Sequence, residues 1–155
     1  MTMRKFVTYL LGCLLPLAVG GASSLITGSA MRDFDQFVKP PFAPPGWLFP
    51  IAWTILYILM GLFSVRILNS DNESKRFILM IYIVQLVLNF FWTILFFSFQ
   101  LRWFAFGELI CLWLLIGMLI VMTMKFDKLT ACLLVPYFLW CSFAMYLNAG
   151  IAVLN

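Results

Sequence analysis

Aromatic side chains recur beside hydrogen-bonding ones, at helical spacing, in three long apolar segments of this 155-residue sequence. A spacing of three or four residues places side chains on one face of a helix. An amide in an apolar environment needs a hydrogen-bond partner, so faces that carry amides should point inward and bring their aromatic neighbours with them. Three such faces together predict a lined cavity. Their residues are Pro50, Trp53 and Tyr57; Gln85, Asn89, Trp92 and Phe96; and Tyr137, Trp140, Ala144, Leu147 and Asn148.

Any one of these faces has a simpler interpretation. Ordinary helix packing, or an aromatic side chain that faces lipid, produces the same spacing. The combination of an aromatic ring with a hydrogen-bonding group on all three faces favours the cavity. Pro136 stands one turn before Trp140, where we expect it to interrupt the helix and widen the space at that level.

The sequence lacks the residues that several other kinds of catalytic or metal-binding site require. The sequence has no histidine, which excludes the Ser-His-Asp triad, histidine zinc sites and the usual proximal haem ligand. It has no glycine-rich phosphate loop. The four cysteines show no C-x-x-C spacing, and we interpret them as small core residues. We therefore predict no metal site and no covalently bound cofactor.

Composition indicates where the helices must lie. With 65% apolar and only 10% charged residues, the chain has too little polar surface for a water-soluble globule. Apolar runs of about 20 residues are long enough to cross a bilayer. We predict an all-α membrane protein, a single domain over 1–155 that forms a bundle of five transmembrane helices. Their approximate ranges are 6–26, 47–68, 76–99, 104–124 and 129–154.

The first apolar run could instead be a signal peptide. Arg4 and Lys5 precede it, and the small residues of "AVGGASS" resemble a cleavage site. The run continues to Ile26, however, and this exceeds the 7–15 residues of a signal core. We therefore expect a retained helix.

Basic residues near the ends of the spans predict the orientation. Seven lie on the side of the N-terminus and three (Arg32, Lys39 and Arg102) on the other side. Because basic residues accumulate in cytoplasmic loops, the N-terminus should be cytoplasmic and the C-terminus should lie outside. No basic patch interleaved with aromatics indicates a nucleic-acid partner.

The longest predicted connection, 27–46, is rich in proline. It is either a simple stop between two helices or a lid over the mouth of a cavity. Phe34, Phe37 and Phe42 would give such a lid an apolar underside, so we favour a long ordered first loop over the cavity. The lid residues would be Pro40, Pro41, Phe42, Pro44, Pro45 and Trp47.

Three segments together resemble the translocator protein family, the tryptophan-rich sensory proteins. They are "KPPFAPPGWLFPIAWTILYILMG", "QLVLNFFWTILFF" and "LLVPYFLWCSFAMYLN". The resemblance covers nearly the whole chain. It implies a five-helix membrane bundle, often a homodimer, in a bacterial cell membrane. It also implies a cavity that binds protoporphyrin IX or a related tetrapyrrole and isoquinoline or benzodiazepine-type drugs, with light- and oxygen-dependent breakdown of the porphyrin.

The family's cavity residues correspond to positions that the helical spacing also selects. They are Trp53, Tyr57, Asn89, Trp92, Trp140, Ala144 and Leu147, to which the spacing adds Gln85 and Tyr137. The electron-rich indoles of Trp53 and Trp140 are the candidate catalytic groups. The alternatives are a transporter or sensor that leaves its ligand unchanged and a structural, partner-binding protein. The family's sterol-recognition pattern is not supported, because nothing after Lys128 is basic.

Overall fold

The structure, a computed structural model, describes residues 3–155, except the side chains of 4–6, 29 and 31–33. Five helical segments are long and apolar enough to cross a membrane. This confirms the prediction of an all-α membrane protein with five spans. The elements are α1 (Met3–Arg32), η1 (Asp33–Gln36), α2 (Leu48–Leu68), α3 (Lys75–Thr93), η2 (Ile94–Ser98), α4 (Arg102–Met124), α5 (Lys128–Cys132) and α6 (Val135–Leu154).

Three boundaries differ from the sequence-based ranges. Helix α1 continues to Arg32, so the first connection begins six residues later than expected. The third span ends in a π-helical turn, η2. The last span is divided into α5 and α6, and Pro136 lies in the first turn of α6. Proline has no N–H to donate and is tolerated in the first helical turn, which explains why the new helix begins there.

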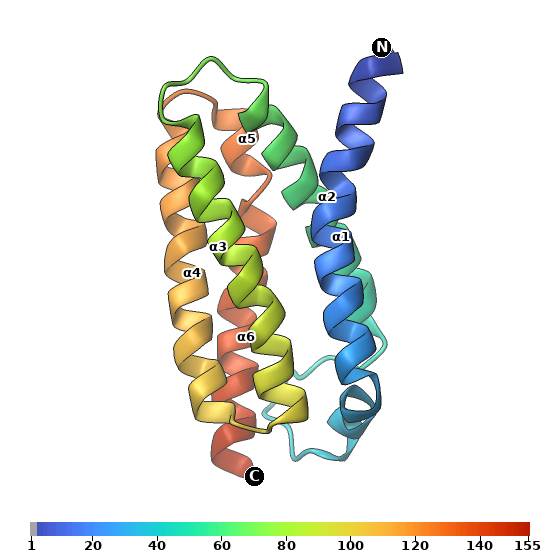
Figure 1. Ribbon diagram of the computed structural model, residues 1–155. Helices are drawn as coiled ribbons and strands as arrows, with labels where there is room; N and C mark the ends of the chain where they lie inside the picture. Colours follow the sequence, from blue (N-terminus) through green and yellow to red (C-terminus); the bar gives the residue numbers. More distant parts are fainter. Residues whose placement is uncertain (1–2) are drawn as a thin grey trace.

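The five spans form one bundle, in which α1 packs along α2 and touches α3, while α4 packs against α3 and α6 (Figure 1). Glycines allow the close approach of the first two helices. A Cβ atom at Gly61 would lie 2.5 Å from Cys13 Cα, and one at Gly20 would lie 2.1 Å from the Tyr57 ring. The small residues that resemble a cleavage site therefore belong to a helix that is packed into the bundle.

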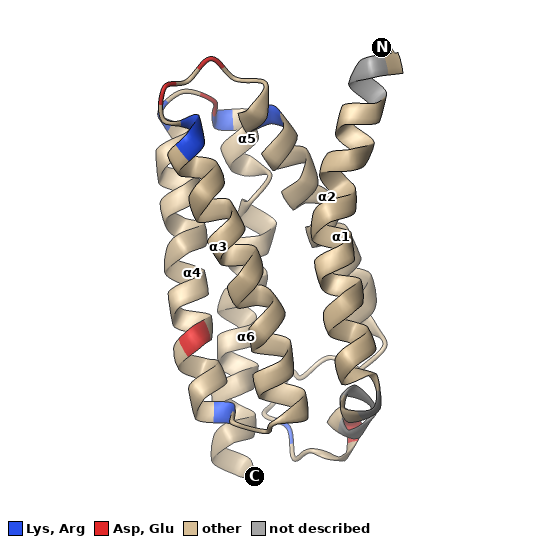
Figure 2. Ribbon diagram, in the orientation of Figure 1, with Lys and Arg blue, Asp and Glu red and all other residues tan. Residues whose placement is uncertain are grey.

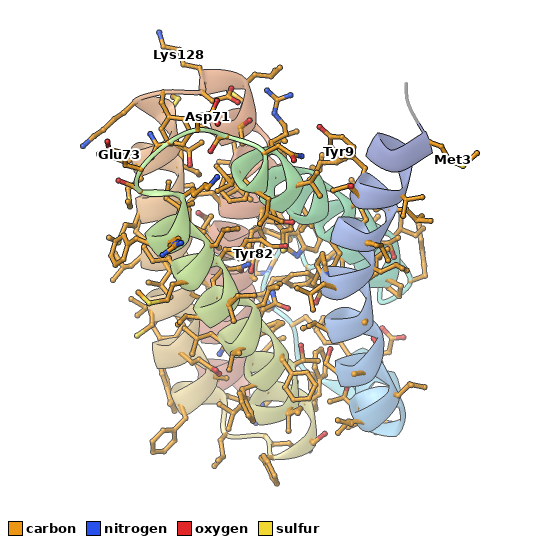
Figure 3. The ribbon with its side chains drawn as sticks, turned by 45° about the horizontal axis from the view of Figure 1, so that its top comes forward. Met3, Tyr9, Asp71, Glu73, Tyr82 and Lys128 are labelled. Atoms are coloured by element: carbon orange, nitrogen blue, oxygen red, sulfur yellow. The ribbon has the colours of Figure 1, made fainter. Side chains whose placement is uncertain are left out.

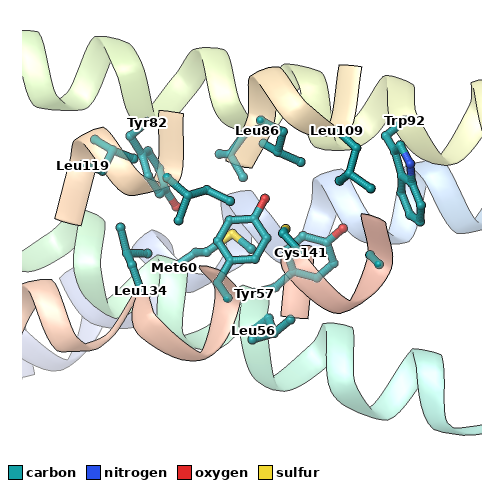
Figure 4. Close-up of a cluster of buried hydrophobic side chains, with 14 of the residues drawn as sticks. Leu56, Tyr57, Met60, Tyr82, Leu86, Trp92, Leu109, Leu119, Leu134 and Cys141 are labelled. Carbon is teal, nitrogen blue, oxygen red and sulfur yellow. The ribbon is translucent and has the colours of Figure 1, made fainter. Parts of the chain in front are cut away.

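The core between α2, α3, α4 and α6 is made of large, fully buried side chains (Figure 4). Tyr137 and Met60 are completely enclosed at its centre, and Leu109 and Leu119 fill it from α4. Burying side chains of this size stabilises a packed interior by about 1.5–3 kcal/mol each in water. Within lipid, the same interlocking acts through van der Waals contact. This part of the bundle is the rigid frame of the site.

Most charged residues lie at the two ends of the bundle, and one acidic residue, Glu108, lies within α4 (Figure 2). Asp71, Glu73 and Lys128 lie at the end where α1 begins (Figure 3). The opposite end holds the first loop and carries Lys39 and Arg102. The N-terminal end of the bundle therefore carries more of the basic residues than the loop end does.

Candidate ligand-binding cavity

A cavity of about 200 Å³ lies between α1, α2, α3 and η2, in the half of the bundle nearer the first loop. Its walls are mostly aromatic and apolar, with small residues on the α1 side and a few hydroxyl groups. The lining residues are Leu17, Gly20, Gly21, Ser23, Ser24, Phe49, Pro50, Trp53, Thr54, Tyr57, Trp92, Thr93 and Phe97.

Trp53 is the centre of the aromatic wall. Its ring stacks on Tyr57, with centroids 5.6 Å apart, and lies 6.2 Å from Trp92. It meets Tyr137 and Trp140 edge-on, at 6.1 and 6.5 Å. These separations fall in the range in which aromatic pairs attract each other. Residues from α2, α3 and α6 are thereby brought together around one indole.

A chain of hydrogen bonds runs behind this wall. The Tyr57 hydroxyl donates to Asn89 Oδ1 at 2.7 Å, and Asn89 Nδ2 donates to the Tyr137 hydroxyl at 3.0 Å. Tyr137 in turn donates to Gln85 Oε1 at 2.9 Å. All four groups are buried. Because an unpaired amide or phenol in lipid is costly, this network fixes the register of α2, α3 and α6.

Of the predicted site residues, Trp53, Tyr57 and Trp92 line the cavity, whereas Gln85, Asn89 and Tyr137 lie behind it in the network. The Trp92 indole N–H is itself held by Asn148 Oδ1 at 3.2 Å. The helical spacing thus selects interior residues, but hydrogen bonding between helices removes three of them from the cavity wall.

The predicted residues of α6 lie on the other side of the aromatic wall. Ala144 and Leu147 line a second cavity of about 10 Å³, whereas Trp140 packs against Trp53 and Phe49. Trp140 Nε1 is buried and has no hydrogen-bond partner within residues 3–155. Its indole N–H is therefore a buried donor that remains available.

The first loop is ordered, but only part of it faces the interior. Phe34 is buried at 3% exposure, whereas Phe42, expected on the underside, is 91% exposed with φ at 65°. The proposed inward direction of Phe42 is therefore wrong, because the turn at this position directs its side chain outward. None of the lid residues lines the 200 Å³ cavity; they are Pro40, Pro41, Phe42, Pro44, Pro45 and Trp47.

The loop is fastened to the end of α6 instead. Pro40 packs closely on Gly150. A Cβ atom at Gly150 would lie 2.6 Å from the proline ring. The Tyr146 hydroxyl donates to the Pro41 carbonyl at 2.8 Å. The Asn155 amide donates to the Val38 carbonyl at 2.9 Å and accepts from the Val38 N–H at 3.1 Å.

The α1 wall is the part of the site that sequence reasoning missed. Gly20, Gly21, Ser23 and Ser24 line the cavity, yet their sequence was interpreted only as a possible cleavage site. A run of small residues within an apolar span also marks a place where another helix or a ligand comes close to the backbone. That signal was available in the sequence.

Together, these features define a multi-pass membrane protein of five spans, with a tryptophan-lined cavity between α1, α2, α3 and η2. The sequence matches the TspO/MBR family over residues 12–154. The chain belongs to this family.

Relatives of the chain include bacterial and animal proteins. The chain is 37% identical to the tryptophan-rich protein TspO of Chlorobaculum tepidum, over 99% of both chains. It is 31% identical to the tryptophan-rich sensory protein of Cereibacter sphaeroides, over 100% of this chain and 94% of the relative. It is 35% identical to the translocator protein of Ovis aries, over 79% of this chain and 75% of the relative.

Proposed function

We propose that the protein binds a tetrapyrrole such as protoporphyrin IX in the tryptophan-lined cavity and promotes its light- and oxygen-dependent degradation. One observation carries the proposal. Trp53, on the cavity wall, has four oxidisable aromatic rings within 6.5 Å, namely Tyr57, Trp92, Tyr137 and Trp140. A flat, apolar macrocycle gains most from such surroundings, since stacking on an indole contributes about 1–3 kcal/mol per ring by analogy with nucleic-acid bases.

The charges near the first loop suit the acidic side chains of a porphyrin. Arg102 lies with its guanidinium 4.8 Å from the Phe37 ring, and its Nε is buried without a hydrogen-bond partner among the described residues. Lys39 is the second cation at this end. Guanidinium and ammonium groups are good partners for carboxylates. A macrocycle among the aromatic rings would direct its propionates to this end of the bundle.

In this function the ligand supplies the difficult chemistry and the protein supplies enclosure and orientation. Light excites the bound porphyrin, an electron passes to it from the indole of Trp53 or Trp140, and molecular oxygen reacts with the radicals that result. Aromatic neighbours stabilise the oxidised indole. The enclosed site keeps the reacting partners together.

The experiment compares Trp53→Phe and Trp140→Phe with Trp103→Phe. Phenylalanine keeps an aromatic face but lacks the readily oxidised indole, so porphyrin binding in the dark should persist. Loss of the porphyrin absorption spectrum in light should slow at least tenfold in the first two variants. Trp103 is 59% exposed and lies outside the cavity, which makes it a cleaner control than Trp113, whose indole N–H is hydrogen-bonded to Ser142. Degradation at the wild-type rate in all three variants would contradict the proposal.

A second function, sensing or carrying a porphyrin without chemical change, is favoured by the name of the sensory relative. It predicts binding that depends on the cavity and degradation that does not depend on the tryptophans. The same comparison of variants therefore decides between the two functions. Drug-like isoquinolines, as flat aromatic molecules, should compete for the same walls.

We also propose a cellular setting. The basic end of the bundle, where α2 ends near Arg66 and where α3 and α5 begin at Lys75 and Lys128, should face the cytoplasm of a bacterial cell together with the N-terminus. The first loop and Asn155 should then face outward, and two copies should form a homodimer. A tag added after Asn155 should be accessible from outside intact cells. A tag added before Met1 should not be accessible.

A further inference from the structure

The two cavities share three aromatic side chains. Phe49, Trp92 and Phe97 line both the 200 Å³ cavity and the 10 Å³ cavity beside α6. Ala144 and Leu147 line only the smaller cavity. Small shifts of these rings would therefore join the two spaces.

Phe34 occupies the space on the α6 side. It lines the smaller cavity and is buried, although its neighbours Asp35 and Gln36 are exposed. Its ring meets Phe49 edge-on at 5.0 Å and Phe97 at 6.2 Å. The smaller cavity has a free volume of only about 10 Å³, and the Phe34 ring forms one of its walls.

The geometry points to Phe34 as a plug: when no ligand is bound, its ring occupies the α6 side of the ligand site, where the family resemblance places Ala144 and Leu147. This inference rests on the proposed function for the identity of the ligand. The Phe34 ring stands where a flat aromatic part of the ligand would lie, among other aromatic rings and beside Ala144. Ligand binding displaces Phe34 and joins the two cavities.

The size of the larger cavity supports this arrangement. Pockets for drug-sized ligands typically have volumes of about 300–1,000 Å³, and the larger cavity alone has about 200 Å³. No α6 residue lines it within the described part of the chain. Removal of one phenyl ring from the smaller cavity would extend the site to α6.

The segment that carries Phe34 is short and is held partly by an ion pair. It is a single 3₁₀ turn, and Lys39 holds it by lying 4.6 Å from the Phe34 ring and 3.0 Å from Asp35 Oδ1. Exposed ion pairs of this kind add little stability. The loop beyond it is fastened to α6 through Pro40, so only the start of the loop must move.

A ligand that competes with Phe34 binds with an affinity reduced by the fraction of molecules whose site is open. Phe34→Ala should therefore increase the association rate of protoporphyrin IX in the dark, measured by quenching of tryptophan fluorescence. Because the burial of the Phe34 ring would no longer oppose opening of the site, we expect this rate to increase about tenfold or more. Phe42→Ala, in the same loop but at an exposed ring, is the matched control and should leave the rate unchanged. An unchanged or slower rate in Phe34→Ala would overturn the inference.

A second measurement does not need a porphyrin. Ala144→Cys places a thiol in the smaller cavity, where it should react slowly with N-ethylmaleimide because Phe34 covers it. Adding Phe34→Ala should increase labelling of this cysteine, followed by peptide mass spectrometry, by about tenfold, whereas adding Phe42→Ala should not. Equal labelling in both double variants would show that Phe34 covers nothing.

The two measurements separate the inference from the proposed function. Faster labelling without porphyrin binding in any variant would refute the tetrapyrrole ligand and support the role of Phe34. If Phe34→Ala does not fold, Phe34→Leu keeps an apolar anchor without the ring and should give a smaller increase in both rates. No increase in the folded Leu variant would likewise overturn the inference.

Discussion

The two ends of the bundle are held together in different ways. At the basic end, the Arg66 guanidinium donates to Asp127 Oδ2 at 3.0 Å and also to the Thr130 hydroxyl. Asp127 is the N-cap of α5 and accepts from the Thr130 N–H at 3.0 Å. At the loop end, neutral hydrogen bonds from Tyr146 and Asn155 and the packing of Pro40 hold the first loop on α6.

This difference indicates which end can open. The basic end joins α2 to the start of α5 by charge-assisted hydrogen bonds, which are about twice as strong as neutral ones. The hydrogen bonds that join the first loop to α6 are neutral and lie at an exposed surface, each contributing about 0.5–1.5 kcal/mol. The cavity lies nearer the weaker end. We therefore expect a ligand to enter by local movement of the loop while the rest of the bundle keeps its packing.

The largest effect is expected at the loop end, from Ala144→Phe. Added bulk in the smaller cavity should block the α6 side of the ligand site, because overpacking costs about 1–3 kcal/mol, or roughly tenfold to a hundredfold in affinity. The measurement is titration of protoporphyrin IX or an isoquinoline drug in the dark. Leu139→Phe, on the 61% exposed face of the same helix, is the control. Wild-type affinity in Ala144→Phe would place this residue outside the ligand site.

A smaller effect, on stability alone, is expected at the basic end from Asp127→Ala. Loss of the N-cap and of the contact to Arg66 should lower the free energy of unfolding by about 1–2 kcal/mol. Hydrogen bonds from the Thr130 hydroxyl and N–H, with a smaller contribution from Arg66, lower the Asp127 pKa from 3.8 to about 2. Its stabilising contribution is therefore present above about pH 4 and is lost as the pH falls toward 2.

Thermal unfolding in detergent tests this prediction. The wild type should be more stable than Asp127→Ala at neutral pH, and the difference should shrink between pH 4 and pH 2. Porphyrin affinity at neutral pH should be equal in the two proteins. An affinity that falls together with stability would show that the two ends are coupled and would remove the distinction between them.

The smallest effect is expected from Tyr146→Phe, which removes the hydrogen bond to the Pro41 carbonyl. We expect a loss of about 0.5–1 kcal/mol, confined to the loop. Hydrogen–deuterium exchange should become several-fold faster in residues 37–47. Exchange at the start of α5 should not change. Equal acceleration at both sites would indicate global rather than local loosening.

Much of the fold could be predicted because bilayer thickness and backbone hydrogen bonding constrain it strongly. Five apolar runs gave five helices, and Pro136 marked the interruption in the last one. The continuation of α1 to Arg32 was not predicted, because the helix extends beyond the apolar run and its last residues are polar or small. The π-helical turn of η2 depends on packing and leaves no local signal.

The site was predicted less completely, and the reasons are physical. Helical spacing identified the inward faces that carry Asn89 and Tyr137, but it could not show that these two side chains satisfy each other instead of facing a cavity. It could not distinguish Phe34 from Phe42, because the direction of a loop side chain depends on backbone turns. The binding and catalytic roles of Trp53 and Trp140 stay predictions.

The central claim is that a tetrapyrrole binds in the cavity between α1, α2 and α3. The most direct measurement is dark titration of protoporphyrin IX against Gly21→Phe and Gly28→Phe. A Cβ atom at either glycine meets no other atom within 4 Å, but only Gly21 lines the cavity. The account predicts that Gly21→Phe fills the cavity and reduces affinity at least tenfold, while Gly28→Phe binds like the wild type. Equal, undiminished binding in both variants would contradict it.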